Sequence, residues 1–596
     1  MLPSKVRKNQ LITRRTFLLL IAKLGLLGVL ASRIFYLQIL KSSQYKILSE
    51  KNRINIIMLP SKRGKILDCK GNVLAVNQLF FRVLIDKNIL AKNNTLSTES
   101  LYKILELTEE EQENINEQIF KAKSHDCITI AENISWQQLV AIEEQALDLP
   151  GVYIDSIEFR TYPYSLSTSH ILGYTSLPNS KEKSILKIKN ANINIGKVGV
   201  EKSFEEELRG TFGFKKVEVN AHGLTIRELD TMPSTSGQDL ALSIDINLQN
   251  KLYEMFNNCH GAAILTETDT GKIKALISAP GYDTNSFSKG VNTEYWQSLN
   301  NDPYKPLINK ASQSLYPPGS IFKLITILAA LEYGIDPKTT IYCNGKSFVG
   351  NKNFCCWYHS GHGNIDMANA TKHSCNSYMY YIAKIIGPNN ILSVAKKLGF
   401  GNKTGINLLE EIAGFLPTPD WKRKKMNSKW MLGDTLNISI GQGYISATPL
   451  QLARMITSIA NGEKLLQLSL IQKDNNYHQT LNIDKKHIDF IHKSLKSVVN
   501  EIGGTAYSNN NLDIRISGKT GTAQVKSKKS RNDDFSKESI PWQMRNHGLF
   551  VGFAPSDNPK YAISVIVEHG KSGAKAAAPI AKNILAEALQ QGKEYI

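Results

Sequence analysis

The feature that most limits how this chain can fold is an apolar segment near its N-terminus, TFLLLIAKLGLLGVLASRIFYLQIL, from Thr16 to Leu40. A helix needs about 20 such residues to cross the hydrocarbon core of a bilayer. Lys23 interrupts the segment, and one lysine is tolerated when its ammonium reaches the interface or a partner helix. Basic residues precede the segment, and such flanks stay cytoplasmic: Lys5, Arg7, Lys8, Arg14 and Arg15. The sequence predicts a cytoplasmic tail over 1–15, a membrane anchor over 16–40 and export of the remainder.

Two other readings of this segment stay open. Val29-Leu30-Ala31 resembles a signal-peptide cleavage site, and TRRTFLL resembles a twin-arginine export signal. An uncleaved anchor is favoured because the apolar character continues to Leu40, well beyond the cleavage candidate.

The exported part is too long for one domain, because the chain has 596 residues. The formal net charge of the whole chain is +19. No zinc-finger spacing, RNA-binding motif or basic-aromatic stripe accompanies this charge, so a nucleic-acid partner is not expected. A basic surface that faces an anionic wall or membrane is the favoured interpretation.

A turn-rich stretch, PSTSGQ at 233–238, divides the exported part. Residues 41–238 are predicted to form a mixed α+β pedestal without a catalytic cluster. KGNVLAVN and FFRVLID are expected as short strands there, and Gly199 to Gly213 as an amphipathic helix. Residues 239–596 begin with a hairpin pattern, continue with helical patterns and end with two strands and a helix. This order predicts an α+β domain, an antiparallel sheet flanked by helices.

The stretch PPGSIFKL places a serine and a lysine at the start of an apolar helix. Ser320 and Lys323 are three residues apart, so they share one face of the helix. A serine hydroxyl needs a base to become a nucleophile, and a lysine whose charge is destabilised by burial can be that base. S-x-x-K alone is a weak signal, because an N-capping serine beside a surface lysine gives the same pattern.

Two further motifs strengthen this interpretation. Ser374-Cys375-Asn376 and Lys519-Thr520-Gly521-Thr522 follow in the order typical of class A β-lactamases and penicillin-binding proteins. Ser374 can relay a proton and Asn376 can hold the substrate's peptide group. Lys519, with Thr520 and Thr522, can hold a carboxylate. Gly521 lets the strand approach the substrate, and the N–H groups of Ser320 and Thr522 would form an oxyanion hole.

Longer motifs resemble those of class B penicillin-binding proteins, from about residue 55 to 580. RGKILDCKGNVLA, RTYPYSLSTSHILGYT and GKVGVEKSFEEELRGTFG resemble the pedestal motifs. GHGNIDM, WMLGDTLNISIGQGYISATPLQLA and GKTGTAQV resemble the penicillin-binding protein 2 family, the elongation-specific branch. Ile321 departs from the family's usual threonine and is expected to affect packing only.

The resemblance implies a peptidoglycan D,D-transpeptidase of the bacterial inner membrane, with a periplasmic catalytic domain and no organic cofactor. Its substrates would be stem peptides ending in D-Ala-D-Ala, and β-lactams would acylate Ser320. A minor D,D-carboxypeptidase activity is compatible with the same site. The implied partners are a SEDS-family glycosyltransferase and other membrane proteins of the elongation complex.

Other functions of the same motifs were weighed. A β-lactamase would need a deacylating glutamate, and no suitable E-x-x-x-N pattern is present. A bifunctional class A enzyme would need an E-D-x-x-F pattern, which is absent from 41–235. A catalytically silent scaffold would be expected to lack Ser320, Lys323 or Lys519. A membrane-anchored β-lactam sensor and a septal class B transpeptidase remain the alternatives.

Four of the seven cysteines fall between Cys343 and Cys375, with His359 and His362 among them. A disulfide from Cys343 to Cys355 or Cys356 is one interpretation, and a zinc site of three cysteines and one histidine is the favoured one. Some penicillin-binding protein 2 members bind zinc through two aspartates, the G-H-G histidine and the cysteine of the second motif. The resemblance therefore implies a structural zinc on Cys343, Cys356, His362 and Cys375, with Cys343 and Cys356 in the aspartate positions.

Overall fold

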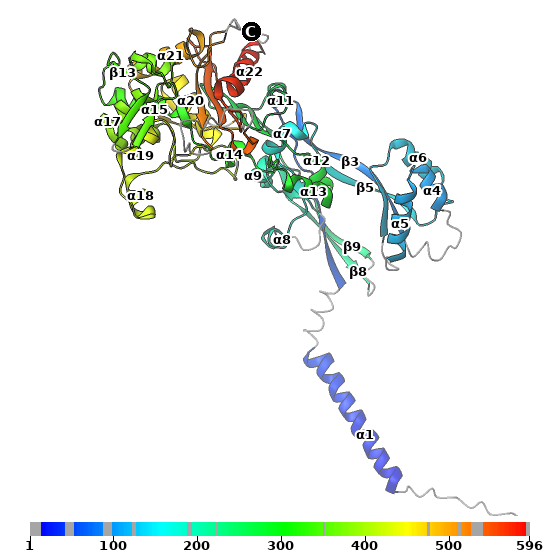
Figure 1. The fold of residues 1–596 in the computed structure, drawn as a ribbon. Coiled ribbons are helices and arrows are strands. Elements are labelled where there is room, and N and C mark those ends of the chain that lie inside the picture. Colours follow the sequence, from blue (N-terminus) through cyan, green and yellow to red (C-terminus); the bar gives the residue numbers. More distant parts are fainter. Residues whose placement is uncertain are drawn as a thin grey trace, which may run out of the picture. The chain divides into compact units, whose positions relative to one another are not determined.

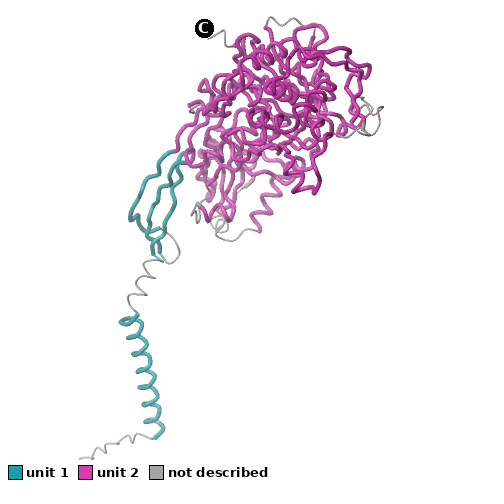
Figure 2. Tube along the Cα trace, turned by 90° about the vertical axis from the view of Figure 1, so that its left-hand side faces the viewer, with its two compact units in different colours: residues 1–62, 188–191, 210–236 teal, residues 63–187, 192–209, 237–596 magenta. Residues whose placement is uncertain are grey.

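The structure is a computed structural model. It describes residues 14–41, 53–86, 98–121, 127–186, 193–220, 225–349, 352–473, 477–508, 514–525 and 540–591. Most of the predicted tail, residues 1–13, lies outside these ranges. The chain forms two compact units (Figure 2), the first of residues 1–62, 188–191 and 210–236 and the second of the rest. The second unit combines most of the predicted pedestal with the C-terminal region, and the boundary at residue 238 stays a prediction.

The first unit contains the N-terminal helix and a small sheet. Helix α1 (Arg14–Phe35) continues as a π-helical turn, η1 (Tyr36–Leu40) (Figure 1). Phe17–Leu40 is long and apolar enough to cross a membrane, and its side chains are exposed. An apolar helix without a protein partner is consistent with a single-pass anchor. The sheet pairs β1 (Ile54–Leu59), β8 (Gly213–Val219) and β9 (Thr225–Met232) antiparallel.

In the second unit, the part that precedes residue 210 is built on two long paired strands. Strand β3 (Val73–Asp86) pairs antiparallel with β5 (Val152–Thr161) from Val76 opposite Thr161 to Ile85 opposite Val152. Strand β4 (Cys127–Glu132) pairs with the distal part of β3. A separate small core surrounds that end, and Figure 1 shows its helices there: α4 (Thr98–Ile104), α5 (Glu109–Lys121) and α6 (Trp136–Glu144).

At the other end of these strands, two arginines are buried on one glutamate. Glu201, in helix α9 (Gly199–Ser203), has no exposed surface. Its carboxylate accepts hydrogen bonds from Arg63 Nε and Arg160 Nε, each at 2.7 Å. Burial alone would raise the pKa of Glu201, but the two guanidinium groups lower it. This network joins the start of the unit, strand β5 and α9, three segments far apart in sequence.

Residues 239–596 contain the predicted antiparallel sheet. Its strand order is β12-β11-β21-β20-β19. Strands from the beginning and the end of this region lie side by side, since β11 pairs with β21. Alternate residues of β20 point to opposite faces, so Val551 and Phe553 join one core and Phe550 the other. The strands are β11 (Gly261–Glu267), β12 (Ile273–Ala279), β19 (Ser517–Ala523), β20 (His547–Ala554) and β21 (Tyr561–Val567).

Helices cover both faces of this sheet. One face packs against α11 (Ile246–Glu254) and α22 (Ala578–Gln591). The other packs against a larger helical layer that includes the apolar helix after PPGS. Its helices are α15 (Lys323–Glu332), α16 (Met367–Lys372), α17 (Asn376–Lys397, broken at Gly387), α19 (Leu432–Ser439), α20 (Pro449–Asn461) and α21 (Lys485–Asn500). The predicted fold class is confirmed.

Small hairpins and short helices complete this region. Strand β13 (Ile341–Cys343) pairs with β16 (Gly363–Ile365), and β14 (Lys346–Val349) pairs with β15 (Lys352–Cys355). The β14–β15 hairpin is enclosed by the β13–β16 pair, and all four strands lie in the cysteine-rich segment between α15 and α16. Other short helices between residues 239 and 596 are α12 (Thr284–Lys289), α13 (Thr293–Asn301), α14 (Lys310–Gln313) and α18 (Pro419–Met426).

Candidate active site

Ser320 lies in a tight turn rather than in the α-helix itself. The turn is the 3-10 segment η2 (Gly319–Phe322), and α15 begins at Lys323. Gly319 has a φ of +54°, and a Cβ there would lie 2.6 Å from the Thr522 carbonyl oxygen. Glycine is therefore required, because the nucleophile turn must approach strand β19 closely.

The Lys323 side chain is completely buried, and its ammonium contacts the second motif. It donates hydrogen bonds to the Ser374 carbonyl oxygen at 2.7 Å, to Ser374 Oγ at 3.1 Å and to Asn376 Oδ1 at 2.6 Å. Burial lowers the pKa of Lys323 to about 8. About a fifth of the lysine is then neutral at a pH of about 7.4, and the neutral form is the one that accepts a proton.

The second motif forms a sharp turn at the start of α17. Ser374 has a φ of +55°, in the left-handed region that side chains other than glycine and asparagine disfavour. Cys375 is the N-cap residue, and Asn376 begins the helix. This turn directs the Ser374 hydroxyl and the Asn376 side-chain oxygen toward the Lys323 ammonium.

The third motif occupies β19, opposite β20. Lys519 is completely buried, and its ammonium donates to the Thr520 carbonyl oxygen at 3.2 Å. Burial, and then the charge of Lys323, hold the pKa of Lys519 well below its usual value. Ile321 is buried, and a Cβ at Gly521 would lie 3.0 Å from its side chain. This contact agrees with the expectation that Ile321 affects packing.

Two further side chains fix this strand, and the three-motif pattern does not include them. Thr520 Oγ1 donates to Thr505 Oγ1 at 2.8 Å. Gln442 Nε2 donates to the Thr522 carbonyl oxygen at 3.3 Å. Gln442 belongs to the quoted SIGQG stretch, so a signal for it was present. Thr505 carries no sequence signal of its own.

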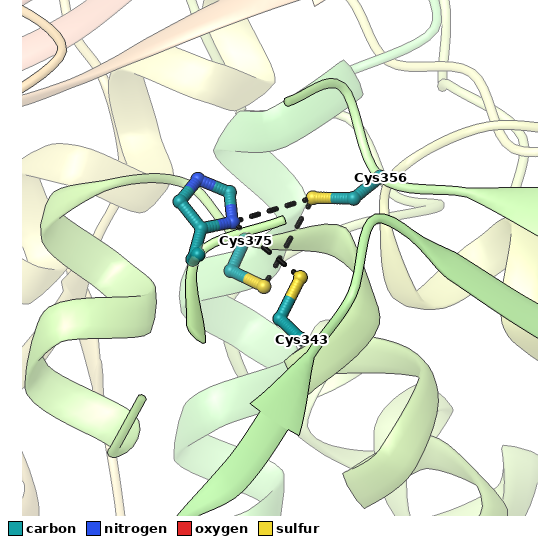
Figure 3. A group of neighbouring side chains, drawn as sticks. Cys343, Cys356 and Cys375 are labelled. Carbon is teal, nitrogen blue, oxygen red and sulfur yellow. Dashed lines mark hydrogen bonds between the residues drawn. The ribbon is translucent and has the colours of Figure 1, made fainter. Parts of the chain in front are cut away.

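The predicted metal ligands come together beside the second motif. The ligand atoms of Cys343, Cys356, His362 and Cys375 all lie within 4.8 Å of one another. His362 Nδ1 is 3.6 Å from the sulfur of Cys343 and of Cys356, and the sulfurs of Cys356 and Cys375 are 4.0 Å apart. Figure 3 shows the three labelled thiols pointing toward one another. All seven cysteines are free thiols here, so the alternative disulfide is not formed.

The donor chemistry of this cluster fits a closed tetrahedral zinc site, which takes thiolate sulfur and imidazole nitrogen. The three sulfurs are buried. The hydrogen bond between the Cys356 and Cys375 sulfurs lowers the pKa of the Cys356 thiol, and backbone N–H groups lower it further. Cys356 is therefore the thiol that first reaches the thiolate form, the form that binds metal.

The fold and this site define a penicillin-binding serine acyltransferase with a pedestal. The family model described as penicillin binding protein transpeptidase domain matches residues 261–586, and that described as penicillin-binding protein dimerisation domain matches residues 58–242.

Relatives with similar sequences identify the branch of the penicillin-binding proteins to which this chain belongs. The chain is 33% identical to peptidoglycan D,D-transpeptidase MrdA of Haemophilus influenzae, over 98% of this chain and 93% of the relative. It is 36% identical to MrdA of Acinetobacter baumannii, over 92% of this chain and 84% of the relative. This chain belongs to the penicillin-binding protein 2 (MrdA) family. The predicted activity, that of a serine-type peptidoglycan D,D-transpeptidase of cell elongation, is thereby confirmed.

Solved structures with a similar fold agree with this family assignment. Penicillin-binding protein 2 of Helicobacter pylori, in its complex with MreC, has a TM-score of 0.78 at 29% identity and covers 90% of this chain and 99% of its own. A structure described as a peptidoglycan synthase complex that coordinates polymerization and crosslinking has a TM-score of 0.73 at 27% identity, over 96% of this chain and 98% of its own.

Proposed function

We propose that Ser320 is the nucleophile and Lys323 the base of the transpeptidation. The observation that carries this assignment is the buried Lys323, whose pKa of about 8 leaves it able to take the Ser320 proton. Ser320 Oγ attacks the carbonyl carbon of the penultimate D-Ala. The negative charge on the carbonyl oxygen is stabilised by the backbone N–H groups of Ser320 and Thr522.

Collapse of this intermediate expels the terminal D-Ala. Its amine takes a proton that Ser374 Oγ relays from Lys323, over the 3.1 Å hydrogen bond between them. Asn376 holds the donor peptide, and Lys519 with Thr520 and Thr522 holds its terminal carboxylate. The acyl-enzyme is then attacked by an amine of a neighbouring stem peptide. β-Lactams resemble the D-Ala-D-Ala end and stop at the acyl-enzyme stage.

The assignment is tested by covalent labelling with a fluorescent penicillin. Ser320→Ala should abolish the label, because no other residue is proposed to form the ester. Thr505→Ser is a matched control, since it keeps a hydroxyl beside Thr520 and should label fully. A fully labelled Ser320→Ala protein would refute the assignment.

We also propose that Cys343, Cys356, His362 and Cys375 hold a structural zinc ion. When bound, zinc would supply a closed four-ligand cross-link and no redox chemistry. The residues come from β13, the segment after β15 and the second motif, so the site would tie the hairpins to Ser374 and Asn376. Elemental analysis should find one zinc per chain. Cys375→Ala should lose the metal and most acylation, whereas Cys259→Ala should keep both. Metal-free protein that acylates normally would contradict the proposal.

The partners we propose act through the pedestal. The similar H. pylori protein forms a complex with MreC, and another neighbour is a peptidoglycan synthase complex. A SEDS-family glycosyltransferase is the proposed partner in the membrane. Stimulation of glycan polymerisation should require residues 41–235 but not Ser320. Full stimulation by the anchor joined directly to the catalytic domain would refute this.

The proposed topology is a cytoplasmic N-terminus, one membrane span and a periplasmic catalytic domain. The single candidate span in the described part of the chain, Phe17–Leu40, supports it. Alkaline phosphatase fused after residue 62 should be active, because it folds only after export. An inactive fusion of full length would contradict this topology.

A further inference from the structure

The segment Cys355-Cys356-Trp357 contacts every residue of the second motif's turn. Asn376 Nδ2 donates to the Cys355 carbonyl oxygen at 3.2 Å, and the Asn376 backbone N–H donates to Cys356 Sγ at 3.4 Å. Trp357 adds two hydrogen bonds from its indole N–H, to the carbonyl oxygens of His373 and Ser374, each at 3.0 Å. Cys356 is a proposed zinc ligand, and Trp357, the next residue, packs against the ring of another, His362.

The Ser374 carbonyl oxygen has two donors. It accepts from the Trp357 indole at 3.0 Å and from the Lys323 ammonium at 2.7 Å. The two side chains therefore meet on one oxygen atom, which a carbonyl's two lone pairs allow. Its direction is set by the unusual backbone of Ser374, whose φ of +55° is disfavoured for serine. A donor that holds this carbonyl also holds the lysine bound to it.

Trp357 is placed poorly for a purely structural role. Its side chain is 53% exposed, whereas a core tryptophan hides most of its ring. Its neighbours are Tyr358 and the His362 ring, with ring centroids 5.8 Å from its own. The part of the residue that is firmly engaged is the indole N–H. The hydrogen bonds, rather than burial, are what this side chain contributes here.

We propose that Trp357 is a positioning residue for acylation. Its indole N–H fixes the Ser374 carbonyl, and this carbonyl fixes the Lys323 amine at the distance from Ser320 that proton transfer needs. The inference rests on the proposed roles of Ser320 and Lys323. It assigns to Trp357 no contact with the substrate, so its loss should slow the chemical step without weakening the binding that precedes it.

The experiment compares full-length variants in stopped-flow acylation by a fluorescent penicillin. The binding constant of the noncovalent complex and the rate constant of ester formation are measured separately. Trp357→Phe keeps a ring and removes the donor. Loss of such hydrogen bonds should slow ester formation about 3- to 10-fold, with the binding constant unchanged. Tyr358→Phe is the matched control at the next, similarly exposed residue, and should acylate at the wild-type rate.

Trp357→Leu removes both the donor and the ring, whereas Trp357→Phe removes only the donor. The two variants should slow ester formation by the same factor, because only the donor is proposed to position the Ser374 carbonyl. Zinc content and the thermal midpoint should match the wild type in both variants. A wild-type rate in Trp357→Phe would overturn the proposal, and so would a slower rate accompanied by loss of zinc or of folding.

A different result would contradict the proposed roles of Ser320 and Lys323. That result is covalent labelling that persists in Ser320→Ala, and it does not depend on the Trp357 variants.

Discussion

Two regions of this molecule bury a pair of cations, and they treat the charge in opposite ways. In the pedestal, Arg63 and Arg160 share the carboxylate of Glu201. In the catalytic domain, Lys323 and Lys519 are completely buried, and neither forms an ion pair with a carboxylate of the described residues. Glu201 and Glu205 raise the pKa of Arg63 despite its burial, while burial lowers those of the two lysines.

This difference in pairing distinguishes a buried charge that stabilises the fold from one that can take part in catalysis. A buried charge with a matched partner stays charged and connects segments of the chain. A buried charge without one is ready to give up its proton, which an active site can use and a pedestal cannot.

The largest effect is expected from Lys323→Met, which replaces the amine by an apolar chain of similar length. Loss of a general base slows acylation by about 10²- to 10⁴-fold. The folded protein should be at least as stable as the wild type, because an unpaired buried charge is removed. Acylation kinetics and urea denaturation check the two parts. A variant that acylates normally, or unfolds because the lysine was structural, would break the contrast.

The opposite result is expected from Glu201→Gln. It leaves two guanidinium groups buried on a neutral amide, which should cost about 3–5 kcal/mol of unfolding free energy. Protein that remains folded should still acylate at the wild-type rate. Glu206→Gln, a neighbouring glutamate at the surface, is the control and should change stability little. Equal stability of the two variants would show that the pairing of Glu201 does not matter.

A third test uses alkaline stability. The folded pKa of Lys323 is about 8, below the usual lysine value near 10.5. Between these pH values the unfolded chain binds more protons, so the lysine's contribution to stability rises with pH. Below pH 8, the unfolding free energy of Lys323→Met should exceed that of the wild type by on the order of 3 kcal/mol. The difference should vanish above the unfolded pKa. A constant difference across this range would contradict the shifted pKa.

The smallest effect concerns coupling between the two lysines. Acylation by the wild type should rise with pH and level off above about 8, as Lys323 loses its proton. The charge of Lys323 lowers the pKa of Lys519, and Coulomb repulsion acts on both partners. Lys519→Met should therefore move the midpoint of the pH profile upward by a fraction of a pH unit. The midpoint, not the rate, is the measure, because this variant also weakens substrate binding.

The sequence indicated which residues come together better than it predicted the backbone around them. The three motifs and the four zinc-ligand candidates come together because each has a residue type and spacing tied to a chemical task. The two short strands expected between 70 and 87 are one continuous strand, Val73–Asp86. Pairing with β5 spans the join between them, and this partner lies more than 60 residues away in the chain.

The helix expected from Gly199 to Gly213 is also different. It is broken at Phe204 into α9 and α10 (Glu205–Arg209), and Gly213 begins a strand. The burial of Glu201 between two arginines helps to explain this, since it fixes α9 in an orientation set by tertiary contacts. Arg160 opens the quoted RTYPYSLSTSHILGYT motif, but nothing in the sequence pairs it with Glu201. Trp357 gave no sequence signal, because it acts through a partner that only the folded chain brings near.

The glycines around the nucleophile limit how this enzyme can evolve under antibiotic pressure. A Cβ at Gly319 would lie 2.6 Å from the Thr522 carbonyl oxygen, and one at Gly441 would lie 2.2 Å from that of Gly319. These backbones cannot yield without moving Ser320 or β19, and both motions would harm the natural reaction as much as the drug's. Resistance through substitution is therefore closed at these two positions. Selection has to act on side chains that border the site and have room to change, and Trp357, half-exposed and one residue from the zinc-ligand candidates, is one of them.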